Sequence, residues 1–349
     1  MSTSRPTARD VAQRAGVSRS AVSMVMNGTA AGNVSAAAQK RIREAARALD
    51  YRPDPLGVSL RQQRTGIIGI VTDEIASSPF AGKLISGVNS AAADRGYLSI
   101  ISDIGQTAFA GPGTVREEHA IRQLIRRRVD ALILATNGLR TLRVPKPLLT
   151  LPAAMANCRD AEGLLAAFIA DEREGAQRAT EHLTALGHRR ILFIGGGDDE
   201  DAIPARLAGY HAAMTTAGLE PLPRVAAGWE INDGFTAAQV VLTGTERPTA
   251  VFAANDRVAT GVLLAAGGLG LLVPQDLSIL GFDDQPHLAE ATVPGLSTMG
   301  LPHFEMGRQA AEHVLNLLDG QESKTNGAMI HCHLTLRDST GPAPAGFSY

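Results

Sequence analysis

The chain has 349 residues, of which 44% are hydrophobic and 19% are charged, and its net charge is −2. This length predicts two or three domains, and the balance of apolar and charged residues excludes a disordered chain. The 2 cysteines, Cys158 and Cys332, exclude a disulfide framework and leave only a single bridge open. No apolar run is long enough for a membrane span, and the N-terminus lacks the apolar core of a signal peptide, so we expect a cytoplasmic protein.

Positive charge is concentrated at the N-terminus. Residues 1–64 hold 11 Lys and Arg against 4 Asp and Glu, a net +7, whereas the remaining residues hold 22 against 31, a net −9. Only the first segment therefore has the electrostatics to bind nucleic-acid phosphates.

Residues 6–27 have the pattern of two short helices joined by a tight turn. Thr7 is the expected cap of the first helix, Gly16 supplies a permissive turn backbone, and Ser18 is the expected cap of the second helix. In a helix-turn-helix, the second helix lies in the major groove and its N-terminal side chains meet base edges. An amphipathic helical pair without a DNA role is the alternative. The apolar residues that would close the pair are Val11, Ala12, Ala15, Val17, Val22 and Val25.

The next expected element is a third helix, capped by Ser35 and ending near Leu49, which would complete a three-helix domain. Its basic side chains form either a solvated face or a set of phosphate contacts, and both interpretations stay open. These side chains are Lys40, Arg41, Arg43 and Arg47.

From Thr65 onward, short apolar runs alternate with helical patterns. This alternation predicts an α/β fold with parallel sheets that helices cover on both faces. Strands are expected at residues 66–72, 97–102, 131–135, 148–157, 190–195, 224–227, 250–253 and 278–282. Helices are expected at residues 79–95, 115–128, 174–186, 205–217, 233–242 and 256–269.

The segment from Thr7 to Gly28, TARDVAQRAGVSRSAVSMVMNG, resembles the opening of the lactose/galactose repressor (LacI/GalR) family of bacterial transcription regulators. Later segments extend the resemblance: ALGHRRILFIGG at 185–196, AND at 254–256, LGFDD at 280–284 and LRDSTG at 336–341. The resemblance implies a helix-turn-helix headpiece at residues 1–50, a hinge at 51–64, and a periplasmic-binding-protein-like core at 65–349. The core would have two doubly wound parallel-sheet lobes, one at about 65–157 and 290–320, the other at about 158–289 and 321–340.

The hinge resembles the family's segment that wedges a leucine, here Leu60, into the minor groove. Asp54 as cap and Pro55 at the first helical position could begin a short helix. Gly57 and Val58 depart from the family, which usually has alanine and a basic residue there. A flexible linker whose Leu60 packs on the next domain is the alternative.

The residues predicted to contact DNA include Met24, which stands where many family members carry an arginine that can reach guanine. A methionine cannot make the bidentate contact to guanine, so this chain departs from the family at that base position. The full predicted set is Thr7, Ser18, Arg19, Ser20, Ser23, Met24, Asn27, Arg52 and Leu60.

By resemblance, a second set of residues faces a small-molecule effector. Asn255 and Asp283 each follow a predicted strand, and ligands bind open α/β sheets outside the carboxyl ends of their strands, although capping is the alternative for both. Trp229 could stack on a ring, and Leu301 replaces the family's glutamine, with His303 close by, which argues against assuming a particular sugar. The predicted effector residues are Asp73, Phe80, Arg206, Trp229, Asn255 and Asp283.

We therefore predict a transcription regulator, a repressor in type, that binds double-stranded operator DNA under the control of a sugar-like effector held between the core lobes. A homodimer is expected over a tetramer, because no leucine heptads follow Thr340. No cofactor or metal is implied. His331 and His333 lack further ligands at a recognisable spacing, so residues 331–333 are expected to form an edge strand. The glycines at 195–197 lack a phosphate-loop motif and are expected to form a strand-to-loop turn.

Two other functional classes were weighed. A ligand-binding protein of the periplasmic type, without a DNA function, would explain the core but not the basic N-terminus. An enzyme on the same framework would need a nucleophile and base or a metal-ligand spacing, and the sequence has neither.

Overall fold

The computed structural model describes residues 6–52, 64–76, 78, 81–105, 115–197, 201–244, 246–321 and 326–344. Its contacts divide the chain into two compact units, Met1–Ile67 and Ile68–Tyr349, which we call the N-terminal unit and the core. Several residues singled out from the sequence lie outside the described residues: Asp54, Pro55, Gly57, Val58, Leu60 and Phe80.

The N-terminal unit contains three helices, α1 (Ala8–Ala15), α2 (Arg19–Met26) and α3 (Ala36–Ala48). Its predicted caps are confirmed. The Asp10 carboxylate accepts from the backbone N–H and the hydroxyl of Thr7, at 2.8 and 2.7 Å, and these bonds lower the pKa of Asp10. Gly16 adopts φ 64° in the turn, and the Ser18 hydroxyl accepts from the Ala21 N–H at 3.2 Å.

The interior of the N-terminal unit is small, because it is built mainly from valine and alanine. Val11, Val22 and Ile42 are fully buried and join the three helices. Met24, predicted to contact DNA, is partly buried and packs against this cluster. A flexible thioether fills such irregular gaps readily, which explains its inward packing.

The first lobe of the core is a sheet of six described strands in the order β10-β5-β4-β3-β1-β2. The strand bounds are β1 (Ile67–Thr72), β2 (Leu98–Asp103), β3 (Ala131–Leu142), β4 (Ala153–Asp160), β5 (Ala166–Ala170) and β10 (Gly327–Ile330). From β1 through β3, β4 and β5 to β10, every neighbouring pair is parallel.

Helices cover both faces of this sheet. On one face, α5 (Gly82–Asp94) and α11 (His303–Leu318) pack on the buried side chains of Ile68 and Ile70. On the other, α6 (Val115–Arg126) approaches Gly69, where an added Cβ would lie 3.0 Å from a methyl of Leu124. Alternate residues of a strand face opposite sides of a sheet, and nearly all residues of β1 are buried. Both faces of the sheet must therefore be covered by helices.

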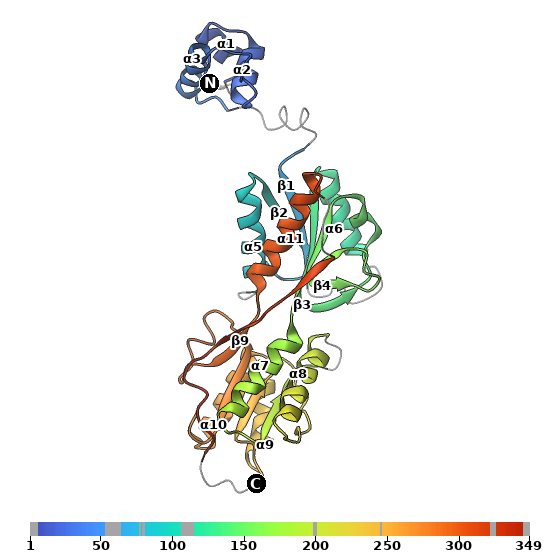
Figure 1. Cartoon of the computed structure of the whole chain (residues 1–349), viewed down its shortest axis with the longest axis vertical. Helices are drawn as coiled ribbons and strands as arrows, with labels where there is room; N and C mark the ends of the chain where they lie inside the picture. The colour runs from blue at the N-terminus through green and yellow to red at the C-terminus, as the bar shows by residue number, and fades with distance from the viewer. Residues whose placement is uncertain are drawn as a thin grey trace. The chain divides into compact units, whose positions relative to one another are not determined.

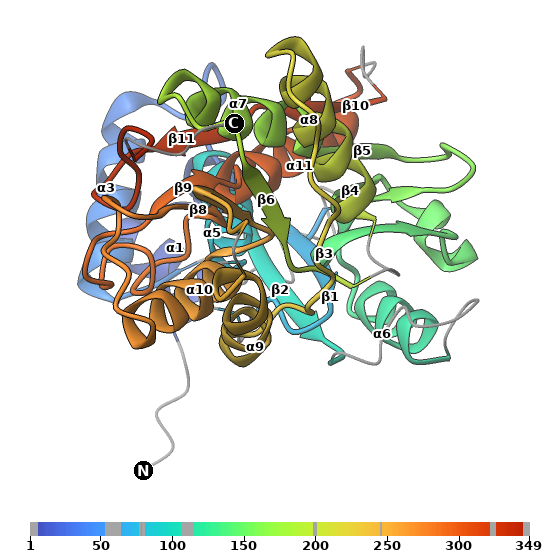
Figure 2. The ribbon, with the colours of Figure 1, turned by 90° about the horizontal axis from the view of Figure 1, so that it is seen from below.

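The second lobe is a sheet of five described strands in the order β11-β9-β8-β7-β6. The bounds are β6 (Ile191–Ile194), β7 (Ala250–Ala253), β8 (Ser278–Asp283), β9 (Ser297–Gly300) and β11 (His333–Thr335). β6 to β9 run parallel, and β11 is antiparallel to β9. Helices α7 (Glu172–Ala185) and α8 (Ala202–Thr216) cover one face, and α9 (Ile231–Leu242) and α10 (Asp256–Gly268) cover the other (Figure 2).

The expected lobe boundaries need correction. β5 and β10 belong to the first lobe although both were assigned to the second, and β9 belongs to the second although it was assigned to the first. The chain crosses between the lobes after Ala170, after Gly300 and after Ile330 (Figure 1). These strands are short and pair with partners far along the chain, for example Ile330 with Ala170, so local patterns did not reveal them.

Other elements also differ from the prediction. The sequence did not predict α11. The edge strand expected at His331–His333 begins only at His333, as β11, and the strand expected at 224–227 is a single bridge between Val225 and Ile194. β3 continues to Leu142, and the fourth predicted strand begins only at Ala153, after a 3-10 turn at Lys146–Thr150. Among the described residues, no helix is long and apolar enough to cross a membrane.

Candidate functional site

The outer face of α2 presents polar side chains at its N-terminal end. Arg19 and Ser20 are exposed, and Ser23 and Asn27 are partly buried and joined by a 3.1 Å hydrogen bond from the Asn27 amide. Thr7 and Arg52, predicted in the same set, are also exposed. The helix thus offers a guanidinium, hydroxyls and an amide at one surface, which are groups that bind phosphates and base edges.

The basic side chains of α3 do not all face solvent freely. The Arg41 Nε donates to the carbonyl oxygen of Ala15 at 3.2 Å, which satisfies an acceptor at the end of α1. Arg43 donates to the Gln39 side chain, and Arg47 donates to the Arg43 carbonyl, both at 3.3 Å. Arg41 therefore has a structural role, and the exposed Lys40 has no such bond among the described residues.

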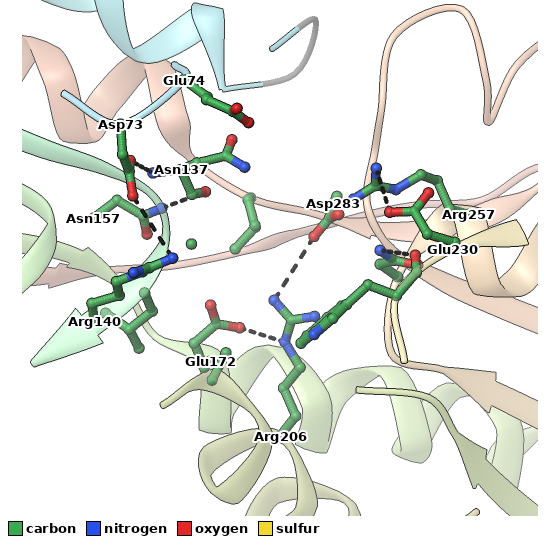
Figure 3. Close-up of a pocket in the computed structure, with 16 residues that line it drawn as sticks. Asp73, Glu74, Asn137, Arg140, Asn157, Glu172, Arg206, Glu230, Arg257 and Asp283 are labelled. Carbon is green, nitrogen blue, oxygen red and sulfur yellow. Dashed lines mark hydrogen bonds and ion pairs between the residues drawn. The ribbon is translucent and has the colours of Figure 1, made fainter. Parts of the chain in front are cut away.

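The core contains a cavity of about 340 Å³ between its two lobes (Figure 3). Five of the six residues predicted to bind an effector line this cavity, and the sixth, Phe80, lies outside the described residues. Leu301, at one lobe crossing, lines it too. The lining residues are Asp73, Glu74, Asn137, Gly138, Leu139, Arg140, Asn157, Glu172, Ala202, Arg206, Trp229, Glu230, Asn255, Arg257, Asp283 and Leu301.

The first-lobe wall is organised around Asp73, which directly follows β1. Its carboxylate accepts from the backbone N–H of Asn137 at 2.7 Å and lies 3.8 Å from the Arg140 guanidinium. Burial raises the pKa of Asp73 to about 6, against the opposing effects of the Asn137 bond and Arg140. Asn157 donates to the carbonyls of Thr136 and Asn137, at 3.0 and 3.1 Å, and so joins β4 to the part of β3 where the register of the two strands shifts.

The second-lobe wall is organised around Arg206 of α8, which is 3% exposed. Its Nε donates to Glu172 Oε2 at 2.7 Å, another guanidinium nitrogen donates to the Ala254 carbonyl, and Asp283 lies at 3.8 Å. Burial by itself would lower the pKa of Arg206, but Glu172 and Asp283 raise it overall. The side chain is therefore held in place and charged, and Figure 3 shows its guanidinium directed toward Glu172 and Asp283.

Asp283 ends β8 with φ 107°, a backbone conformation that side chains other than glycine rarely adopt. Its carboxylate accepts from the Gln285 side-chain amide at 2.9 Å, and burial raises its pKa to about 6 despite the neighbouring Arg206. Asp256, behind it, accepts from the Thr298 hydroxyl and the Gln285 N–H at 2.5 and 2.7 Å. Burial and Asp283 raise the pKa of Asp256 well above its usual value.

Asn255 caps helix α10. Its Oδ1 accepts from the Val258 N–H at 2.8 Å at the start of α10, and its amide donates to the Trp229 carbonyl at 3.1 Å. The residue therefore lines the cavity and also holds the Trp229 segment. Beside it, Arg257 and Glu230 form an ion pair at 3.1 Å.

Seven polar residues of the cavity, Glu74 among them, were not predicted. Two of them, Asn137 and Asn157, follow buried runs, and the expectation that ligands bind beyond strand ends could have identified both. Glu172 follows β5, an unpredicted strand, so no local signal pointed to it. The missed residues are Glu74, Asn137, Arg140, Asn157, Glu172, Glu230 and Arg257.

The glycine run at 195–197 and the histidines at 331 and 333 lie in turns and at a strand start. Gly195 and Gly196 form a turn beyond β6, with N–H groups that donate to the carbonyls of Val225 and Gly228. His331 precedes β11 and His333 begins it. Within the described ranges, no cluster of three or more His, Cys, Asp or Glu residues could hold a metal ion.

Comparisons with known proteins cover both units. Residues 7–54 match the bacterial regulatory proteins of the lacI family, and residues 180–340 match the periplasmic binding protein-like domain. The chain is 31% identical to the HTH-type transcriptional repressor CytR of Escherichia coli (strain K12), over 97% of each protein. It is 32% identical to the ribose operon repressor of the same strain, over 89% of this chain and 92% of that protein.

Solved structures of transcriptional regulators also superpose on almost the whole chain. A crystal structure of the lac repressor dimer bound to operator and the anti-inducer ONPF superposes with a TM-score of 0.78, at 26% identity, and covers 97% of this chain and 100% of that one. A complex of the transcriptional regulator CelR with cellobiose superposes with a TM-score of 0.65, at 27% identity, and covers 96% and 100%.

Proposed function

Because this chain belongs to the LacI/GalR family of DNA-binding transcription regulators, we propose that it is a repressor whose affinity for operator DNA is controlled by a sugar-like molecule bound between the lobes of its core. The observation that carries the proposal is the cavity itself. Charged groups from both lobes converge on it, with the buried Asp73 and the partly exposed Arg140 on one wall and the buried Arg206 and Asp283 on the other. A molecule with several hydroxyls can bond to both walls at once.

Such bridging would couple ligand binding to the angle between the lobes. Each lobe has its own buried interior, and within the described residues the chain passes between the two sheets at three crossing segments. A ligand that contacts both walls therefore favours one lobe angle, and in a homodimer the change would be passed to the paired N-terminal units. The expected coupling free energy is about 1 to 3 kcal/mol.

DNA recognition is assigned to the N-terminal unit. Residues 1–64 carry the net charge of +7, and the exposed end of α2 supplies Arg19 and Ser20. We propose that the exposed polar residues of this unit, Thr7, Ser18, Arg19, Ser20 and Arg52, contact the operator together with Ser23 and Asn27. Met24 would contribute through packing, because its side chain contacts the interior of the unit.

The proposal is tested by fluorescence anisotropy of the full chain on an operator selected from random DNA. A compound that shifts the emission of Trp229 should change operator affinity by about fivefold to a hundredfold. A matched chain without residues 1–61 should keep the Trp229 response and lose specific DNA binding. A compound that binds the cavity and leaves operator affinity unchanged would contradict effector control.

A further inference from the structure

Each arginine of the cavity is already paired with a carboxylate. Arg140 lies 3.8 Å from Asp73, the Arg206 Nε lies 2.7 Å from Glu172, and Arg257 lies 3.1 Å from Glu230. Figure 3 shows these pairs spread around the cavity. An anionic ligand that approached any of these guanidiniums would have to displace a carboxylate or share the cation with it.

Carboxylates also outnumber guanidiniums in the lining. Asp283 lies 3.8 Å from Arg206 and is the second acid beside that arginine. With Glu74, which is in none of the three pairs, the lining contains five acidic residues and three arginines. The raised pKa values of Asp73 and Asp283, about 6 for each, leave both groups mainly ionised at neutral pH. The cavity therefore has a net negative potential, and low-dielectric walls strengthen such a potential.

The lining also contains buried polar atoms that have no hydrogen-bond partner among the described residues. They are the Asn137 Oδ1, which is an acceptor, and the Trp229 Nε1 and Arg257 Nε, which are donors. A hydroxyl group can accept from a donor and donate to an acceptor, whereas an ammonium group only donates and a phosphate dianion only accepts. An uncharged hydroxyl-bearing ligand matches both kinds of atom.

We infer that the cavity selects an uncharged, polyhydroxylated ligand and rejects the phosphorylated or carboxylate form of the same molecule. The inference rests on the proposed function for its identification of this cavity as the effector site. It adds the charge state of the ligand, and it makes Glu230 a specificity-determining residue. Glu230 occupies Arg257, a cation that would otherwise attract an anion.

Trp229 provides a direct test, because it is the only tryptophan of the chain and lines the cavity. The full chain is titrated with iodide, acrylamide and caesium, and each quenching constant is divided by that of free N-acetyltryptophanamide. The normalised constant for iodide should be the lowest of the three, by about twofold or more, because the negative potential repels the anion. A normalised iodide constant equal to that of caesium would overturn the inference.

A matched pair of variants separates the cavity from the net charge of the protein. Glu230→Gln removes the partner of Arg257, and Glu118→Gln removes the partner of Arg122, which lies 3.3 Å away on the exposed helix α6. Only Glu230→Gln should raise the iodide constant, by about twofold, while the acrylamide constant stays unchanged. An equal rise in both variants would show that iodide responds to overall charge, and it would overturn the role of Glu230.

The same emission then compares neutral molecules with their phosphorylated forms: ribose with ribose 5-phosphate, adenosine with adenosine 5′-monophosphate, and glucose with glucose 6-phosphate. A response to a neutral member that exceeds the response to its phosphate supports the inference, and the reverse order overturns it. Failure of effector control appears instead in the operator assay, so the two failures can be distinguished.

Discussion

The two candidate binding regions of this protein differ in how their charged groups are held. In the N-terminal unit, Arg19 and Ser20 lie on one helix and are exposed. In the core, Arg206 is 3% exposed and is bonded to Glu172 and to the Ala254 carbonyl, which come from other elements. An exposed arginine stays hydrated until a binding partner displaces the water, whereas a buried arginine loses its water when the protein folds. Removing the first should therefore impair only binding, and removing the second should also impair the fold.

The largest expected effect follows from Arg206→Ala. The variant would leave Glu172, Asp283 and the Ala254 carbonyl buried without their cation, so the core should lose about 3 to 5 kcal/mol of unfolding free energy. Effector affinity should fall as well, because the second-lobe wall loses its centre. Urea denaturation followed by far-UV circular dichroism measures the stability.

The control for this variant is Arg122→Ala. Arg122 forms an exposed pair with Glu118 at 3.3 Å, one helical turn away, so its loss should cost less than about 0.5 kcal/mol. Equal costs for the two variants would refute the claim that burial distinguishes the arginines of the core.

Arg19→Ala tests the exposed arginine of the N-terminal unit. Because Arg19 is exposed at the start of α2, the variant should keep the stability of the chain and lose about 1 to 3 kcal/mol of specific operator binding. If the contact is to a phosphate, the loss should be similar for all sequences, and the salt dependence should become less steep by about one unit. Anisotropy titrations at several salt concentrations decide between these cases, and unchanged operator affinity would remove Arg19 from the interface.

The stabilities of the two regions should also depend differently on acidic pH, because residues 1–67 contain no histidine. In the core, burial, with Lys83 and Arg206, lowers the pKa of His303 to about 3. A histidine that stays neutral in the folded state contributes to the free energy of unfolding at pH values above its unfolded pKa of 6.5. This contribution is lost as the pH falls from 6.5 toward 3. For His303 the loss between pH 7.5 and 5.5 should be about 1.4 kcal/mol.

The measurement compares urea unfolding of the wild type and His303→Gln at pH 7.5, 6.5 and 5.5. Buried carboxyls such as Asp73 and Asp283, with pKa values raised to about 6, act in the opposite direction, but both proteins contain them. The stability difference between the two proteins should therefore shrink by about 1.4 kcal/mol on acidification. A difference that is independent of pH would show that His303 keeps an ordinary pKa.

The smallest expected effect concerns the Ser18 cap of α2. Ser18→Ala removes the acceptor of the Ala21 N–H and should cost the N-terminal unit about 1 kcal/mol, while Ser18→Gly should cost only a few tenths. Amide hydrogen exchange in α1 to α3 measures this cost in the full chain, and exchange in the core should not change. Equal protection in both variants would show that the hydroxyl contributes little.

Elements that depend on neighbours in the chain were predictable from the sequence. The caps Thr7, Ser18 and Ser35 act within three residues, and Gly16 satisfies a local backbone requirement. The apolar runs of β1, β6, β7 and β8 are buried on both sides, so they stand out without an alternating pattern. Asp73 and Asp283 were found for a related reason, because each lies at the carboxyl end of such a run.

Tertiary structure alone decided which lobe received β5, β9 and β10, since each short strand is stabilised by a partner distant in sequence or across a lobe crossing. It also decided that Arg206 meets Glu172 and Asp283, which lie 34 and 77 residues away from it along the chain. The energy of an ion pair depends on the distance between its charges and on their burial, and neither quantity is encoded by local spacing. The sequence determined that these charged residues are present, and the fold determined which of them pair around the cavity.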